Sequence, residues 1–153
     1  MRSSAGINSL VFIALLILAF TSNAGSQSSD CRSESVDKNV RCANIYVEFG
    51  DVTTSRLSGI VDSPLDVPIV VEIYKINRSE RRKDSYKLIQ GREPTTAIET
   101  NAEGKFCHPG LADGHYVVRF GTSDGGWNCS WIKVHILKGS LDKKIKVDLT
   151  LGI

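Results

Sequence analysis

Residues 144–151 read KIKVDLTL, and apolar and polar side chains alternate along this stretch without a break. Ile145, Val147 and Leu149 fall on one phase, and lysine, aspartate and threonine follow them in turn. Successive side chains of a β-strand point to opposite faces of a sheet. The stretch therefore predicts a strand with one buried and one solvent-facing side.

Similar strand-like runs recur along the rest of the chain. They lie at residues 45–49, 57–61, 69–73, 95–100, around 106, 116–120 and 132–136. Turn-forming sequences separate them, at residues 50–51, 62–64, 101–104, 109–110, 113–114 and 124–126. Short strands at such regular spacing predict an all-β fold, an antiparallel sandwich of seven to eight strands. Faces can also be assigned, because Val71 and Ile73 share one phase and Glu72 takes the other.

One segment breaks this rhythm. Residues 77–94 are rich in charge and contain the basic cluster Arg78, Arg81, Arg82 and Lys83 beside acidic neighbours. We interpret the segment as a long solvated loop or an exposed hairpin, with a docking or processing site as the alternative for the basic cluster. No segment of the chain shows convincing helical periodicity.

The N-terminus has the layout of a secretory signal peptide. Arg2 supplies a positive charge, residues 10–20 (LVFIALLILAF) are apolar, and small residues follow up to Ala24. The apolar run is about half of the ~20 residues that a membrane-spanning helix needs. We therefore expect residues 1–24 to be cleaved, and the remainder to be exported to an extracellular or periplasmic space without a membrane span. The Ser-rich residues 25–42 are predicted to be a flexible leader, and residues 43–153 the folded domain.

Charge excludes some partners. The chain has 19 basic and 17 acidic residues, and loss of the signal removes one basic residue, leaving a net charge near +1. A nearly neutral surface gives no reason to expect binding to nucleic acid or to an anionic membrane.

Four cysteines, Cys31, Cys42, Cys107 and Cys129, lie beyond the signal. An even number in an exported chain predicts two disulfides, for which three connectivities exist. Cys31–Cys42 with Cys107–Cys129 is favoured because each bond closes a short loop. A metal site is the alternative, but the chain has no Cys-x-x-Cys pair, and its histidines are scattered in the sequence.

Catalytic patterns are missing from the sequence. The histidines are His108, His115 and His135; the last two fall on the outward phase of their strands, so we interpret all three as surface or rim residues. A Gly-x-Ser-x-Gly elbow and a glycine-rich phosphate loop are also absent from the sequence. We therefore predict no catalytic residues, no metal and no cofactor.

Several short motifs occur in an order that is similar to a known family. They are SGIVD (58–62), VPIVVEI (67–73), TNAEGKF (100–106), LADGHYVV (111–118) and IKVDLTL (145–151). From residue 57 onward the chain resembles carboxypeptidase regulatory-like domains, which belong to the transthyretin-like or prealbumin-like β-sandwiches. Other immunoglobulin-like sandwiches remain the alternative. The resemblance implies an accessory role, because in carboxypeptidases this domain is an appendage without the zinc site.

The chain also departs from that family. The charged segment between Ile76 and Thr95 is longer than the usual link, and the leader and residues 45–49 precede the family's typical start. His108 stands where the family often has a second apolar residue after the hairpin phenylalanine. Phe106 and Tyr116, each following a turn glycine, are predicted to anchor the core.

Two groups of residues are candidates for binding or modification. Trp127, Trp131 and Tyr74 are candidate exposed aromatics for stacking on a sugar ring or on a protein partner; packing against the sheet is the alternative. Asn77 and Asn128 lie in tripeptides that match the N-glycosylation signal. The expected function is protein interaction or an accessory structural role, with carbohydrate binding as the alternative.

Overall fold

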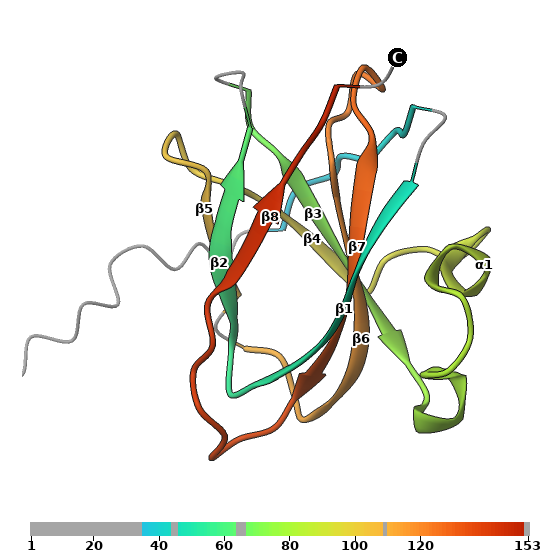
Figure 1. Ribbon diagram of the computed structural model, residues 1–153, viewed down its shortest axis with the longest axis vertical. Coiled ribbons are helices and arrows are strands. Elements are labelled where there is room, and N and C mark those ends of the chain that lie inside the picture. The colour runs from blue at the N-terminus through green and yellow to red at the C-terminus, as the bar shows by residue number, and fades with distance from the viewer. Residues whose placement is uncertain (1–34, 44–45, 64–66, 109, 152–153) are drawn as a thin grey trace, which may run out of the picture.

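Eight β-strands and two short helical elements form the computed structural model, which describes residues 35–43, 46–63, 67–108 and 110–151 (Figure 1). The strands are β1 (Tyr46–Thr54), β2 (Leu57–Asp62), β3 (Val70–Ile76), β4 (Thr96–Glu99), β5 (Lys105–His108), β6 (Gly114–Gly121), β7 (Cys129–Ile136) and β8 (Ile145–Asp148). A 3₁₀-helix, η1 (Arg78–Glu80), and a helix, α1 (Ser85–Ile89), lie between β3 and β4. The predicted all-β class is confirmed.

The strands form two mixed sheets. One has the order β1-β7-β6-β3-β4, and the other has the order β5-β2-β8. β1 runs parallel to β7 and β2 runs parallel to β8, whereas the other neighbours are antiparallel. The expectation of a purely antiparallel fold is therefore wrong. Side chains alternate in the same way in both kinds of pair, so the pattern carries no information about strand direction.

An apolar core fills the space between the two sheets. Both sheets contribute to it, for example through Val118 of β6 and Val147 of β8, which are fully buried. Phe106 of β5 packs edge-on against Phe120 of β6, with ring centroids 5.2 Å apart. The side chains of Phe106 and Tyr116 are both 2% exposed, which confirms them as core anchors.

The opposite face of the five-stranded sheet is also covered. Figure 1 shows α1 on the side of this sheet that faces away from the three-stranded sheet. Leu88 and Ile89 of α1 are buried there in a second apolar cluster that includes Trp131. Residues 77–94 are therefore a partly helical cover, and the prediction of a loop or exposed hairpin is wrong. The helix has five residues, too few to give a periodic signal, and is capped by the Asp84 carboxylate, which accepts from Lys87 N–H.

The predicted turn at residues 50–51 is a β-bulge. The register of β1 against β7 shifts between Glu48 and Asp51, and Gly50 has a φ of +40° that side chains rarely allow. β1 therefore continues to Thr54, and the chain reverses at residues 55–56 before β2 begins.

The segment before β1 lies across the outer face of the five-stranded sheet. The N–H of Val36 donates to Ala97 O at 3.0 Å, and the N–H of Arg41 donates to Thr122 O at 2.9 Å. Residues 36–42, predicted as the end of a flexible leader, are thus held on the sheet. The predicted signal at residues 1–24 and the first part of the leader lie outside the described residues. Within the described part, the helical elements are too short to cross a lipid bilayer.

One disulfide joins this segment to the sheet. Cys42 is bonded to Cys129 at the start of β7, with Cα atoms 5.2 Å apart. Cys107 is disulfide-bonded as well, and Cys31 lies outside the described residues. The predicted Cys107–Cys129 and Cys31–Cys42 pairs are therefore wrong. Short loop length favoured them, but the path of residues 36–42 brings Cys42 to β7.

Candidate functional site

The aromatic residues predicted to be exposed are buried. Trp127 and Trp131 are each 2% exposed and Tyr74 is 3% exposed, so an open stacking platform at these residues is ruled out. The predicted phase of Trp131 is correct, because its side chain points away from the inter-sheet core into the second cluster. For Tyr74 and Trp131 the prediction failed because α1 and residues 36–42 cover that face, whereas Trp127 is buried in the core between the two sheets.

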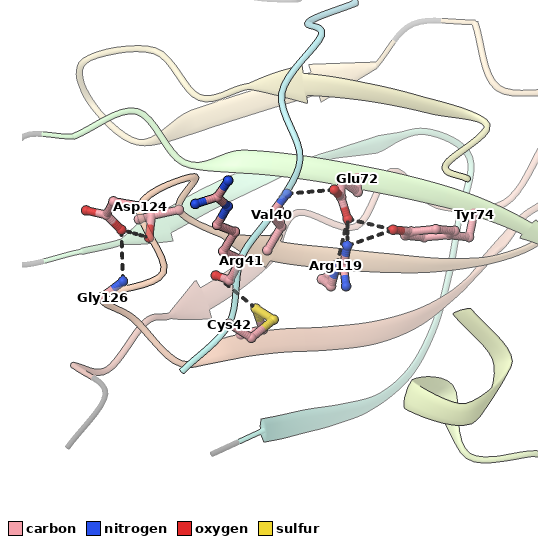
Figure 2. Close-up of a disulfide and its surroundings, with 10 residues drawn as sticks. Val40, Arg41, Cys42, Glu72, Tyr74, Arg119, Asp124 and Gly126 are labelled. Carbon is pink, nitrogen blue, oxygen red and sulfur yellow. Dashed lines mark hydrogen bonds and ion pairs between the residues drawn. A yellow bond between two sulfur atoms is a disulfide. The ribbon is translucent and has the colours of Figure 1, made fainter. Parts of the chain in front are cut away.

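A buried ionic network lies beneath residues 36–42 (Figure 2). The Glu72 side chain is 1% exposed and forms an ion pair with Arg119, whose Nε donates to Glu72 Oε2 at 2.6 Å. The Tyr74 hydroxyl donates to the same carboxylate at 2.6 Å, and the N–H of Val40 donates to it at 2.7 Å. Burial and then the hydrogen bond to Glu72 raise the pKa of Tyr74 well above its usual value. The network is closed by protein groups and serves to hold the N-terminal segment.

The two candidate glycosylation sites have different environments. Asn128 is 4% exposed, and its amide nitrogen donates to Thr150 Oγ1 at 3.1 Å and to Leu151 O at 3.3 Å. The folded domain has no room for a glycan on that nitrogen. Asn77 is exposed at the start of η1, and its use stays a prediction.

Two of the three histidines lie together. His115 of β6 and His135 of β7 are directly opposite in the strand register, and their rings stack with centroids 4.3 Å apart. Partial burial, followed by the charges of His135 and Arg81, lowers the pKa of His115. His108 lies at the end of β5 in the other sheet. In the described ranges, no group of three or more histidine, cysteine or acidic residues is arranged to hold a metal ion.

One recess of the described surface lies at one end of the two sheets. It has a volume of about 550 Å³. Its lining comes from the end of β2, the residues just before β3, the β4–β5 turn and one residue of β8. The apolar part of the lining contains Ile60 and Val67, whose side chains are 39% and 38% exposed. Apolar side chains left open in a concave surface are typical of recognition sites.

The wall formed by the β4–β5 turn is rigid. The Asn101 side-chain oxygen accepts from Glu103 N–H at 3.1 Å and from Lys105 N–H at 2.8 Å. Gly104 has a φ of +73°, and a Cβ there would lie 2.3 Å from the carbonyl oxygen of Val61. Glycine is therefore required where the turn docks on β2, and this wall of the recess is shaped before any ligand arrives.

A second link fixes the neighbouring wall. The hydroxyl of Thr100 accepts from Ile69 N–H at 3.0 Å, and Thr100 N–H donates to Ile69 O at 3.0 Å. Thr100 is buried, so these bonds are shielded from water. Ile69, just before β3, and Thr100, just after β4, are thereby held against each other.

Three charged side chains surround the apolar part of the recess. Asp62 and Glu103 are exposed carboxylates, and Lys146 lies 3.7 Å from Asp148 in an exposed ion pair. The rim therefore has one more acidic than basic group, and its basic group already has an acidic neighbour. Such a site can accept an apolar group that is flanked by a positive charge.

The residues of this recess were not predicted as a site. The turns at residues 62–64 and 101–104 were recognised only as chain reversals. The one available signal is Ile60, an apolar residue on the outward phase of a strand whose inward residues are Gly59 and Val61. An outward isoleucine is common enough that the sequence alone could not distinguish it from an ordinary surface residue.

Comparisons of the chain with protein-family models, with curated proteins and with solved structures each found no match.

Proposed function

We propose that this chain is an exported, non-catalytic β-sandwich module that binds a protein partner through the recess beside Ile60. The observation that carries the proposal is the pair of exposed apolar residues, Ile60 and Val67, in a concavity of about 550 Å³ that the hydrogen-bonded β4–β5 turn walls on one side. A preformed apolar pocket limits the ordering cost of binding, which is why such pockets serve as recognition sites.

The chemistry of the rim defines the partner. Asp62 and Glu103 present two carboxylates, whereas Lys146 is neighboured by Asp148. The proposed ligand is a peptide segment in which an apolar side chain enters the recess and an adjacent lysine or arginine faces the carboxylates. Rim charges of this kind contribute more to specificity and association rate than to affinity.

Export is part of the proposal. It is supported by the signal-like layout of residues 1–24 and by the disulfide between Cys42 and Cys129, because disulfides persist in oxidising compartments. The module would then work in an extracellular or periplasmic space, where it meets its partner after folding.

We also propose that the sandwich is of the prealbumin-like type found in carboxypeptidase regulatory-like domains. One of the motifs behind the resemblance supports this, because residues 111–118 lead into β6 as the strand entry of the family pattern does. Residues 100–106 form the turn between β4 and β5, which belong to different sheets and do not make the hairpin that the resemblance implied. An accessory, non-catalytic role follows from this resemblance, because in carboxypeptidases the domain is an appendage without the zinc site.

Peptide display on the mature, disulfide-intact protein tests the function. We expect enriched peptides to combine an aliphatic or aromatic residue with a neighbouring lysine or arginine. Ile60→Lys should weaken binding of these peptides at least tenfold, because it removes the apolar contact and adds a like charge. Leu141→Lys is the matched control, because Leu141 is 77% exposed and does not line the recess.

Two results would overturn the proposal. One is a set of peptides that bind Ile60→Lys as well as they bind the parent protein. The other is strong binding on a glycan array with no enriched peptide, which would favour the carbohydrate alternative despite the burial of both tryptophans. Glu103→Gln adds a check on the charge argument, since it should reduce the preference for basic residues in the selected peptides.

A further inference from the structure

We propose that His115 and His135 form a site for a single divalent transition-metal ion of the kind that imidazoles bind, with Zn²⁺ as the representative. The two residues are directly opposite each other on the antiparallel strands β6 and β7. Their rings are stacked with centroids 4.3 Å apart and planes inclined by 24°. The pairing of β6 with β7 therefore places the two imidazoles side by side, and the backbone does not have to move to bring them together.

The two rings are close enough to share one ion, but they must turn to do so. Zinc–nitrogen bonds of about 2.0–2.1 Å in tetrahedral geometry place the two nitrogens roughly 3.3 Å apart, with the ion in the plane of each ring. In the stacked arrangement the centroids are 4.3 Å apart and the planes are inclined by 24°, so the in-plane lone pairs of the two rings run nearly parallel. Metal binding therefore requires both side chains to rotate out of the stack until one nitrogen of each ring faces the same ion, while the backbone keeps its place.

A small cavity lies beside the pair. His115 and His135 line it together with Asp51, Arg81 and Lys133, and its volume is about 10 Å³. That is about the space that one water molecule needs. The cavity therefore admits a single ion or water and excludes larger ligands such as a sugar or a peptide side chain.

The imidazole nitrogens are available. Among the described residues, no hydrogen bond or ion pair engages either ring, and the two rings stack on each other. A histidine binds a metal ion through a ring nitrogen whose lone pair is not already engaged. Both side chains are partly exposed, so an ion can reach them from solvent.

Nearby charges are balanced in pairs. Arg81 contacts the Asp51 carboxylate, with Nε at 3.2 Å and the terminal nitrogen at 3.1 Å, and Lys133 lies 3.1 Å from Glu48. The two positive charges that line the cavity are thus each offset by a carboxylate. Asp51 also lines the cavity, which makes it the available oxygen ligand if Arg81 is removed.

The test is titration of Zn²⁺ into the mature, disulfide-intact protein at pH 7.5 by calorimetry. We expect one site, and at least tenfold weaker binding for His115→Gln and for His135→Gln. His108→Gln is the matched control and should bind as the parent protein does, because His108 lies on the other sheet. Arg81→Ala should bind more tightly, since it removes a positive charge and releases Asp51.

Nuclear magnetic resonance of the imidazole nitrogens gives a readout that needs no variant. Zn²⁺ should shift the ring signals of His115 and His135 and leave those of His108 in place. Shifts at His108, shifts spread equally over all three histidines, or no binding at millimolar Zn²⁺ would overturn the proposal. So would unchanged or weaker binding by Arg81→Ala. The site is separate from the recess, so its failure would leave the proposed peptide binding intact.

Discussion

The N–H of Val40 donates to the buried carboxylate of Glu72 at 2.7 Å, which ties the segment before β1 to β3 of the five-stranded sheet. The same carboxylate accepts from Arg119 and Tyr74, so that one acidic side chain in β3 organises three groups from different parts of the chain (Figure 2). This contact explains why the outer face of the sheet is closed and why Trp131 is buried there.

Removal of that carboxylate should be strongly destabilising. Glu72→Ala leaves the partly buried Arg119 without its partner and the Tyr74 hydroxyl without its acceptor, and breaking a buried pair in this way costs about 3–5 kcal/mol. Urea denaturation of the parent and variant measures the difference. Lys38→Ala, which breaks the exposed Lys38–Glu99 pair, is the control and should cost less than about 1 kcal/mol. A Glu72→Ala variant as stable as the control would contradict the role assigned to the network.

The core anchors should be sensitive to truncation. Phe106 is 2% exposed and packs on Phe120 across the two sheets. Phe106→Ala should lower the free energy of unfolding by about 3–5 kcal/mol, because it leaves a cavity between the layers. Tyr116→Phe, which removes only the 2.8 Å hydrogen bond to Ala112 O, should cost about 1 kcal/mol. Equal losses for both variants would indicate that Phe106 does not bridge the sheets.

Disulfide mapping should find a pairing that sequence spacing did not favour. Digestion under non-reducing conditions should release Cys42 and Cys129 in one linked peptide. Cys107 is also bonded, and Cys31 is the one cysteine of the chain left for it, so a second linked peptide should contain these two. Mass spectrometry before and after reduction identifies both. Recovery of a Cys107–Cys129 peptide would contradict the structure.

Acid titration should report on the cover formed by residues 77–94. The hydrogen bond from Arg92 and then the one from Asn77 N–H lower the pKa of Glu80 from 4.5 to about 2. A lowered pKa in the folded state means that this contact stabilises the fold above pH 4.5. The stabilisation is lost as the pH falls toward 2.

Carboxyl chemical shifts followed by nuclear magnetic resonance measure this pKa directly. Arg92→Ala should raise the pKa of Glu80 toward 4.5, because the first of its causes is removed while the hydrogen bond from Asn77 N–H remains. Lys87→Ala is the control on the same segment and should leave it near 2. A Glu80 that titrates near 4.5 in the parent protein would show that the Arg92 contact is not maintained in solution.

Alternation along the chain was sufficient to predict where strands lie and which side chains face inward. Tyr116, Val118 and Phe120 face the inter-sheet core as their phase requires, and Val117 faces the other way. These properties are local, because the backbone of a single strand sends neighbouring side chains to opposite sides. The turn at Gly104 was also predicted from the local sequence.

Contacts between residues far apart in the chain set the remaining features. The parallel direction of β1 and β8, the Cys42–Cys129 bond and the His115–His135 stack all join segments whose separation along the sequence carries no signal. Burial of Trp131 likewise depends on residues 36–42 and 77–94 folding back over the sheet. A side chain's phase specifies the face of a strand on which it lies, but only packing against distant segments specifies whether that face meets water.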